Sequence, residues 1–116
     1  MTTSDAPTAP EATAGTVAQV KAAPAIGGNV NTIWRNSWTW SPAFGTHNLQ
    51  IPWNVINRES TVVVTASELD ADGHRFVGGA PFSVSSIAPG PGVVTFKINI
   101  GIDRPLPMRT DVIVFN

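Results

Sequence analysis

The fold class of this chain is decided by one stretch, Val93-Val94-Thr95-Phe96-Lys97-Ile98-Asn99-Ile100. From position 94 onward its apolar and polar residues strictly alternate. Successive side chains of a β-strand point to opposite faces of the sheet, so this alternation is typical of a strand with one face buried and the other in water. The stretch therefore predicts a half-buried β-strand.

Four further stretches on either side carry related strand signals. Residues 47–53 and 82–85 alternate between apolar and polar side chains. The run 61–65 is β-branched throughout, which indicates a strand that is covered on both sides or lies at a subunit contact. Residues 111–115 form another largely β-branched run. No helix of ten or more residues with a 3.6-residue period is expected after the first 28 residues.

Turn residues separate these stretches at the spacing expected of a small β-sandwich. Asp72-Gly73 suits the positive φ angles of a type I′ hairpin turn. The other breaks are residues 78–81, 89–92 and 103–107, which contain Gly or Pro. Neither proline of the last break is expected inside a central strand, because proline has no N–H to donate. The sequence predicts an all-β fold, a small antiparallel β-sandwich of about seven to eight strands, immunoglobulin-like or jelly-roll in style.

Composition changes sharply near residue 28. Residues 1–28 hold eight Ala, five Thr, three Pro and three charged side chains, and no aromatic residue. Such a segment cannot bury enough apolar surface to offset the entropy lost on ordering. We therefore divide the chain into a flexible N-terminal arm at 1–28 and a β-sandwich domain at 29–116, which contains all nine aromatic residues.

Charge and composition exclude several classes of function. Seven basic and eight acidic residues give a net charge of −1, whereas a nucleic-acid-binding surface needs a basic excess. No apolar run approaches the roughly 18 residues of a membrane span. The chain has no cysteine, and therefore no disulfide and no Cys-ligated metal. The first residues lack the basic and apolar regions of a signal peptide, which predicts synthesis in the cytoplasm. Two alternatives stay open: the chain remains there, or it leaves by a non-classical route and joins a virion or an exported assembly.

The motifs of catalytic and cofactor sites are missing from the sequence. There is no G-x-S-x-G nucleophile elbow, no Gly-rich phosphate loop and no H-E-x-x-H metal motif. His47 and His74 are expected on a solvated surface. Residues 70–73, Asp-Ala-Asp-Gly, resemble the start of a calcium loop but lack its distant Glu, and a hairpin turn explains them equally well. We expect no enzymatic activity, no cofactor and no metal.

The tryptophans are the most distinctive candidates for a functional surface. Their parity places Trp34, Trp38 and Trp40 on one face of a continuous strand together with Asn36, and Arg35 on the other face. Three interpretations stay open: large core residues, a subunit interface in which Trp and Arg are enriched, or a glycan site in which Trp rings stack on sugars. The full candidate set is Trp34, Arg35, Asn36, Trp38, Trp40 and Trp53.

Low charge density and a net charge near zero favour association over a dispersed monomer. An Ala/Thr/Pro-rich arm ahead of a compact β domain also resembles the layout of virion decoration proteins. We therefore expect a non-enzymatic structural or interaction protein that forms a homo-oligomer or joins a larger assembly, with the arm contacting a neighbour. The alternative is a lectin-like carbohydrate-binding module that uses its surface tryptophans to hold a glycan.

Overall fold

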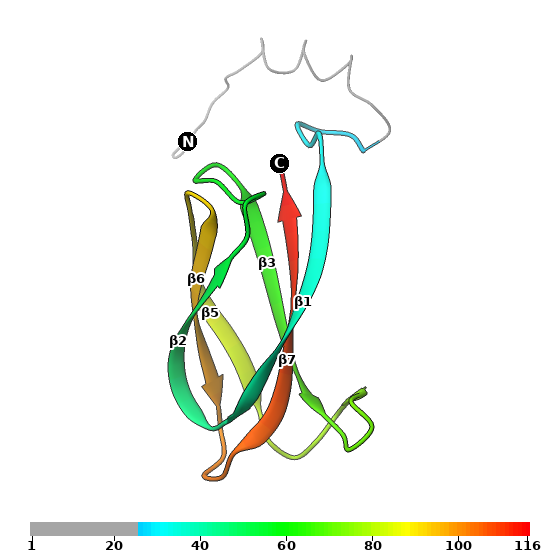
Figure 1. The fold of residues 1–116 in the computed structure, drawn as a ribbon, viewed down its shortest axis with the longest axis vertical. Helices are drawn as coiled ribbons and strands as arrows, with labels where there is room; N and C mark the ends of the chain where they lie inside the picture. The colour runs from blue at the N-terminus through cyan, green and yellow to red at the C-terminus, as the bar shows by residue number, and fades with distance from the viewer. Residues whose placement is uncertain (1–25) are drawn as a thin grey trace, which may run out of the picture. The chain divides into compact units, whose positions relative to one another are not determined.

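The alternating stretch at residues 93–100 forms a strand in the computed structural model, which describes residues 26–116. Among these residues there is no helix, and so none that is long and apolar enough to cross a membrane. The prediction of an all-β fold is confirmed, whereas most of the predicted N-terminal arm lies outside the described residues. The strands are β1 (Ile33–Ala43), β2 (Gly45–Pro52), β3 (Thr61–Leu69), β4 (Arg75–Phe76), β5 (Phe82–Gly90), β6 (Val93–Ile100) and β7 (Leu106–Phe115) (Figure 1).

The strands form two sheets in which all neighbours are antiparallel. The first sheet has the order β1-β7-β3-β4, and the second has the order β2-β6-β5. β1 and β2 follow each other closely in the chain but belong to different sheets, because the backbone bends between Ala43 and Gly45. Gly45 has a φ of 78°, a left-handed conformation that favours glycine. Figure 1 shows this bend as a curve from β1 into β2.

The strand order differs from that of an immunoglobulin domain. In that fold the first, second, fifth and fourth strands form one sheet, and the last strand lies in the other sheet. Here the last strand, β7, pairs with both β1 and β3 in the first sheet, and β6 is central in the second. The immunoglobulin-like style that the sequence suggested therefore does not fit this order.

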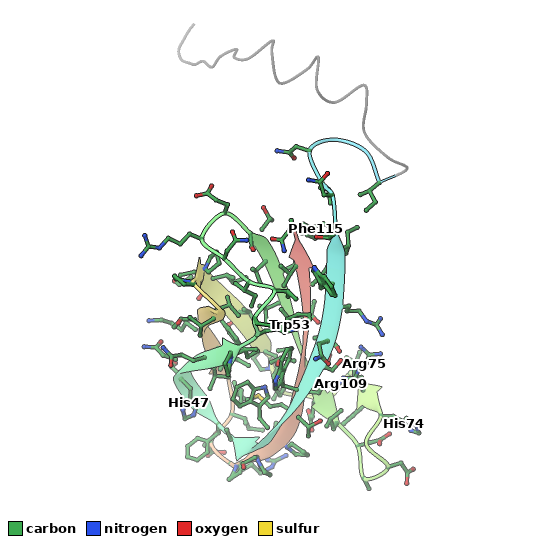
Figure 2. The ribbon with its side chains drawn as sticks, turned by 45° about the horizontal axis from the view of Figure 1, so that its top comes forward. His47, Trp53, His74, Arg75, Arg109 and Phe115 are labelled. Atoms are coloured by element: carbon green, nitrogen blue, oxygen red, sulfur yellow. The ribbon has the colours of Figure 1, made fainter. Side chains whose placement is uncertain are left out.

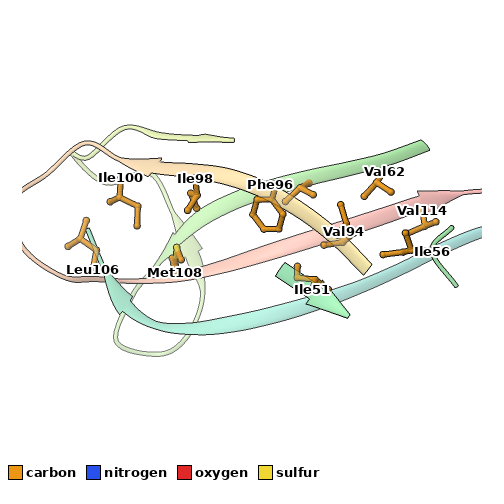
Figure 3. Close-up of a cluster of buried hydrophobic side chains, with 12 residues drawn as sticks. Ile51, Ile56, Val62, Val94, Phe96, Ile98, Ile100, Leu106, Met108 and Val114 are labelled. Carbon is orange, nitrogen blue, oxygen red and sulfur yellow. The ribbon is translucent and has the colours of Figure 1, made fainter. Parts of the chain in front are cut away.

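The apolar core lies between the two sheets (Figure 3). The alternating residues Val94, Phe96, Ile98 and Ile100 of β6 are each at most 1% exposed, so the predicted half-buried strand is confirmed. The first sheet contributes every second residue of β7 and part of β3. Fully burying a side chain of this kind stabilises the fold by about 1.5–3 kcal/mol. The core cluster is Ile51, Ile56, Val62, Val64, Val94, Phe96, Ile98, Ile100, Leu106, Met108, Val112 and Val114.

Pro107 lies inside β7, a central strand, and this contradicts the prediction for the last proline-containing break. The pairing around it explains why it is tolerated. The register between β1 and β7 shifts between Trp40 and Ala43, opposite Pro107, and the pairing of β3 with β7 ends at Met108. A proline at such an irregularity interrupts no regular ladder of hydrogen bonds.

The turn between β3 and β4 also differs from its prediction. A type I′ turn needs a positive φ at both Asp72 and Gly73, but of these two residues only Gly73 has one, at 80°. The Gly73 N–H donates to the Asp70 carbonyl (3.0 Å), and the Asp70 N–H donates to the His74 carbonyl (2.8 Å). The loop is therefore longer than a two-residue hairpin and uses Gly73 in the left-handed conformation, as three-residue hairpin loops do.

Candidate functional site

Four of the six candidate residues lie on the inward face of β1, as their shared parity predicts. Each stands opposite a buried residue of β7. Exposure rises towards the start of the strand: Trp40 and Trp38 are half-buried against the core, whereas Asn36 is exposed and Trp34 is 43% exposed. The inward face of β1 is therefore exposed near the start of the strand and packs against the core near its end.

Trp40 and Trp38 are held by specific contacts. The Nε1–H of Trp40 donates to Oγ1 of Thr110 at 2.9 Å, and Thr110 is fully buried, so this bond satisfies a polar group of the interior. The ring of Trp38 meets that of Trp53 edge to face, with 5.5 Å between centroids and 67° between planes. Trp53 is labelled in Figure 2. Trp38, Trp40 and Trp53 therefore support the core interpretation, whereas the exposed Trp34 does not.

Arg35 lies on the opposite face of β1, beside Ile113 of β7. Adjacent residues of a strand point to opposite faces of the sheet. A single ligand on the inward face would therefore meet Trp34 and Asn36 but not Arg35. The structure thus places four candidates on the inward face of the first sheet and Arg35 on its outward face, while Trp53 follows the end of β2.

The outward face of the first sheet carries an apolar patch that the candidate set does not include. The register places Phe115 beside Ile33, and Ile113 next to Val63 of β3. Ile33 is 48% exposed and Val63 is 40% exposed, while the other two are half-buried. We call Ile33, Val63, Ile113 and Phe115 the outer patch; Phe115 is labelled in Figure 2. Contiguous exposed apolar side chains of this kind mark interaction surfaces.

A charged cluster lies next to the outer patch on the same face, with Arg75 and Arg109 labelled in Figure 2. Asp111 accepts hydrogen bonds from Ser37 Oγ (2.5 Å), Arg109 Nε (3.0 Å) and Arg75 Nη1 (2.7 Å). Partial burial raises the pKa of Asp111, but the hydrogen bonds from Ser37 and Arg109 and the Arg109 charge outweigh it, so the pKa is lowered. The ionised Asp111 side chain therefore links β1, β7 and β4 through these hydrogen bonds.

The outward face of the second sheet has a different chemistry. Two of its cross-strand pairs are hydrogen-bonded, Thr46 Oγ1 to Asn99 Oδ1 at 3.0 Å and Gln50 Nε2 to Thr95 Oγ1 at 3.4 Å. The cross-strand pairs of β2 and β6 on this face are Thr46 with Asn99, Asn48 with Lys97, Gln50 with Thr95 and, at the end of β2, Pro52 with Val93. Apart from Pro52 and Val93, these side chains are polar and well solvated in water.

Three side chains with metal-ligand atoms meet at the β3–β4 turn. The ligand atoms of Asp70, Asp72 and His74 lie within 4.8 Å of one another, and all three residues are exposed. However, Oδ1 of Asp70 already accepts the N–H groups of Asp72 and His74, both at 2.9 Å. The bond from His74 is the largest cause of the lowered pKa of Asp70. The turn therefore accounts for these residues.

His47 lies elsewhere, on β2. It is exposed, and its Nε2 is 2.7 Å from the Phe44 carbonyl oxygen.

Comparison of the chain with protein families, curated proteins and solved structures found no match. Function is therefore inferred from the surfaces themselves.

The outer patch was not among the sequence candidates, although the sequence contains a signal for it. The runs 61–65 and 111–115 place apolar residues at consecutive positions, and a strand must then present some of them on its outward face. Val63 and Ile113 are such residues.

Proposed function

We propose that this protein is a non-enzymatic interaction protein whose β-sandwich domain associates with copies of itself. The observation that carries the proposal is the contrast between the two outward faces. The outer patch exposes Ile33 and Val63, while the corresponding face of the second sheet is polar along most of β2 and β6. Removing apolar surface from water is favourable by about 25 cal/mol per Å². Association through the first sheet is therefore favoured, and incorporation into a larger assembly would cover the same face.

The charged cluster supports the proposal by fixing the face that carries the outer patch. Asp111 links three strands of the first sheet through Ser37, Arg75 and Arg109. A surface that is ordered before binding loses less conformational entropy when a partner docks. The cluster also neutralises part of the arginine charge, which lowers repulsion between two copies.

Replacing Val63 with lysine is expected to weaken self-association by at least about tenfold in Kd, because a charge would lie within the covered patch. Val63 is 40% exposed, so the substitution leaves the core intact. Sedimentation velocity over a range of protein concentrations measures the effect, and circular dichroism checks that the variant is folded.

The matched control is Asn99→Lys, which adds the same charge to an exposed position of β6, the central strand of the second sheet. We expect this variant to associate like the unchanged protein. Equal weakening by both substitutions would show that added charge acts generally, and would contradict a role for the outer patch.

The N-terminal arm is proposed to contact a neighbouring copy. Deleting residues 2–28 is expected to leave the β domain folded and to reduce the oligomer size measured by light scattering, because the arm adds contacts between copies. Unchanged oligomer size after the deletion would remove the arm from the proposal and leave the outer patch as its basis.

A carbohydrate-binding function is the second candidate, and one observation favours it. Trp34 and Asn36 are both exposed on the inward face of β1, where an aromatic ring and an amide lie close enough to meet one sugar chain. A change in tryptophan fluorescence on titration with glycans, absent in Trp34→Ala, would support this function. No change across a broad glycan set would exclude it.

A further inference from the structure

The edges of the two sheets are not equally protected against pairing with another chain. Natural proteins protect sheet edges with short strands, prolines, bulges and charges. β4 is two residues long. β5 has a register shift between Ser85 and Ala88, with Ser86 at a φ of 54°, and contains Pro89. β2 ends at Pro52, and its outward positions before Pro52 are polar.

β1 has none of these features over most of its length. It is 11 residues long, and among the described residues it pairs with β7 alone. Its register is regular from Ile33 to Trp40, and the shift comes only after Trp40. Within this regular part the single charged residue is Arg35, and Pro42 lies beyond it. β1 therefore presents a row of backbone N–H and C=O groups that suits an added strand.

The side chains of β1 indicate that an added strand would bury apolar surface as well. Ile33 is 48% exposed on the outward face, and Trp34 is 43% exposed on the inward face. Cross-strand neighbours on either face of an antiparallel pair contact each other directly. A strand beside the start of β1 would cover the flank of both residues, whereas docking on the outer patch alone would leave Trp34 in water.

We propose that the occupant of this edge is β1 of a second copy, paired antiparallel about a two-fold axis. This inference rests on the proposed self-association and adds a second contact, at the edge of the first sheet, to the one that covers the outer patch. A two-fold pair needs a strand that is complementary to itself. Each β1 brings one charge, so every antiparallel register except the one that sets Arg35 opposite Arg35 avoids a like-charge pair. The first sheets of two copies would then form one continuous sheet with both outer patches on the same face.

The geometry of such a pair gives a sharp test. When a two-fold axis perpendicular to the sheet relates two antiparallel strands, the axis passes midway between one residue of β1 and the same residue of the second copy. That residue therefore lies directly opposite its own copy. Directly opposite Cα atoms are about 4.5–5.5 Å apart, a separation that a disulfide spans. Because the chain has no cysteine, single cysteine substitutions report this position without background.

The experiment introduces one cysteine at a time into the full chain, as Trp34→Cys, Asn36→Cys, Ser37→Cys and Thr39→Cys. The control is Asn48→Cys, an exposed position on β2, an edge strand of the second sheet. Under mild oxidation we expect one of these positions of β1 to form a disulfide-linked dimer about tenfold faster than the control, because pairing raises the local thiol concentration. Circular dichroism confirms that each variant is folded.

Two outcomes would overturn the inference in different ways. If the unmodified protein is oligomeric but no β1 cysteine links faster than Asn48→Cys, the edge pairing is wrong and the proposed self-association stands. If the protein is monomeric and no position links, both proposals fail.

Discussion

Replacing Phe96 with alanine is expected to lower the free energy of unfolding by about 3–5 kcal/mol. Phe96 is 1% exposed on β6, the central strand of the second sheet, where it packs between the two sheets (Figure 3). Truncation removes the transfer free energy of the ring and leaves a cavity that neighbouring side chains fill only in part. Small domains have total stabilities of about 5–15 kcal/mol, so this one change would leave the fold marginal. Urea denaturation measures the shift of the midpoint.

Phe76→Ala is the matched control for this prediction. Phe76 is the same residue type on the short strand β4 and is 43% exposed. Its truncation is expected to change the unfolding free energy by about 0.5 kcal/mol or less, as surface substitutions usually do. Similar losses for both variants would show that the interior between the sheets is not the main source of stability.

Asp111→Asn is expected to lower the unfolding free energy by about 1–3 kcal/mol at neutral pH. The Asp111 side chain is 11% exposed, and the substitution removes the charge that holds Arg75 and Arg109. The pKa of Asp111 is lowered in the folded protein, so its ionised form stabilises the fold. This stabilisation is fully present above the ordinary pKa of about 3.9 and is lost as the pH falls through the lower folded value.

The stability difference between the unchanged protein and Asp111→Asn should therefore be constant near neutral pH and shrink below about pH 4. Thermal or urea unfolding at several pH values measures it. Asp103→Asn, at an exposed position of the loop between β6 and β7, is the control and should give a small effect. A difference for Asp111→Asn that stays the same down to the lowest pH would contradict the role of the ionised carboxylate.

The all-β class could be predicted because it depends on local alternation. The side chains of residues 93–100 reveal which face is buried, and the buried face contains the expected four residues. Features that depend on pairing could not be predicted in this way. Pro107 sits in a central strand because β1 shifts register opposite to it, and that shift is a property of two strands. Strand order is likewise set by contacts between distant segments.

The positions of the candidate residues could likewise be predicted only in part, because burial also depends on pairing and packing between distant segments. Parity places Trp34, Trp38 and Trp40 on one face of β1, but parity does not say how far the second sheet extends over that face. The result is a gradient from the anchored Trp40 to the exposed Trp34. Similarly, Phe115 enters the outer patch through its register with Ile33, which lies far away in the sequence.

The molecular mass in solution, measured by sedimentation equilibrium at micromolar concentrations, tests the proposed self-association most directly. We expect a dimer or larger species whose population rises with concentration, and a shift towards the 12.2 kDa chain mass in Val63→Lys. A single species at the mass of one chain throughout the concentration range would contradict self-association through the first sheet.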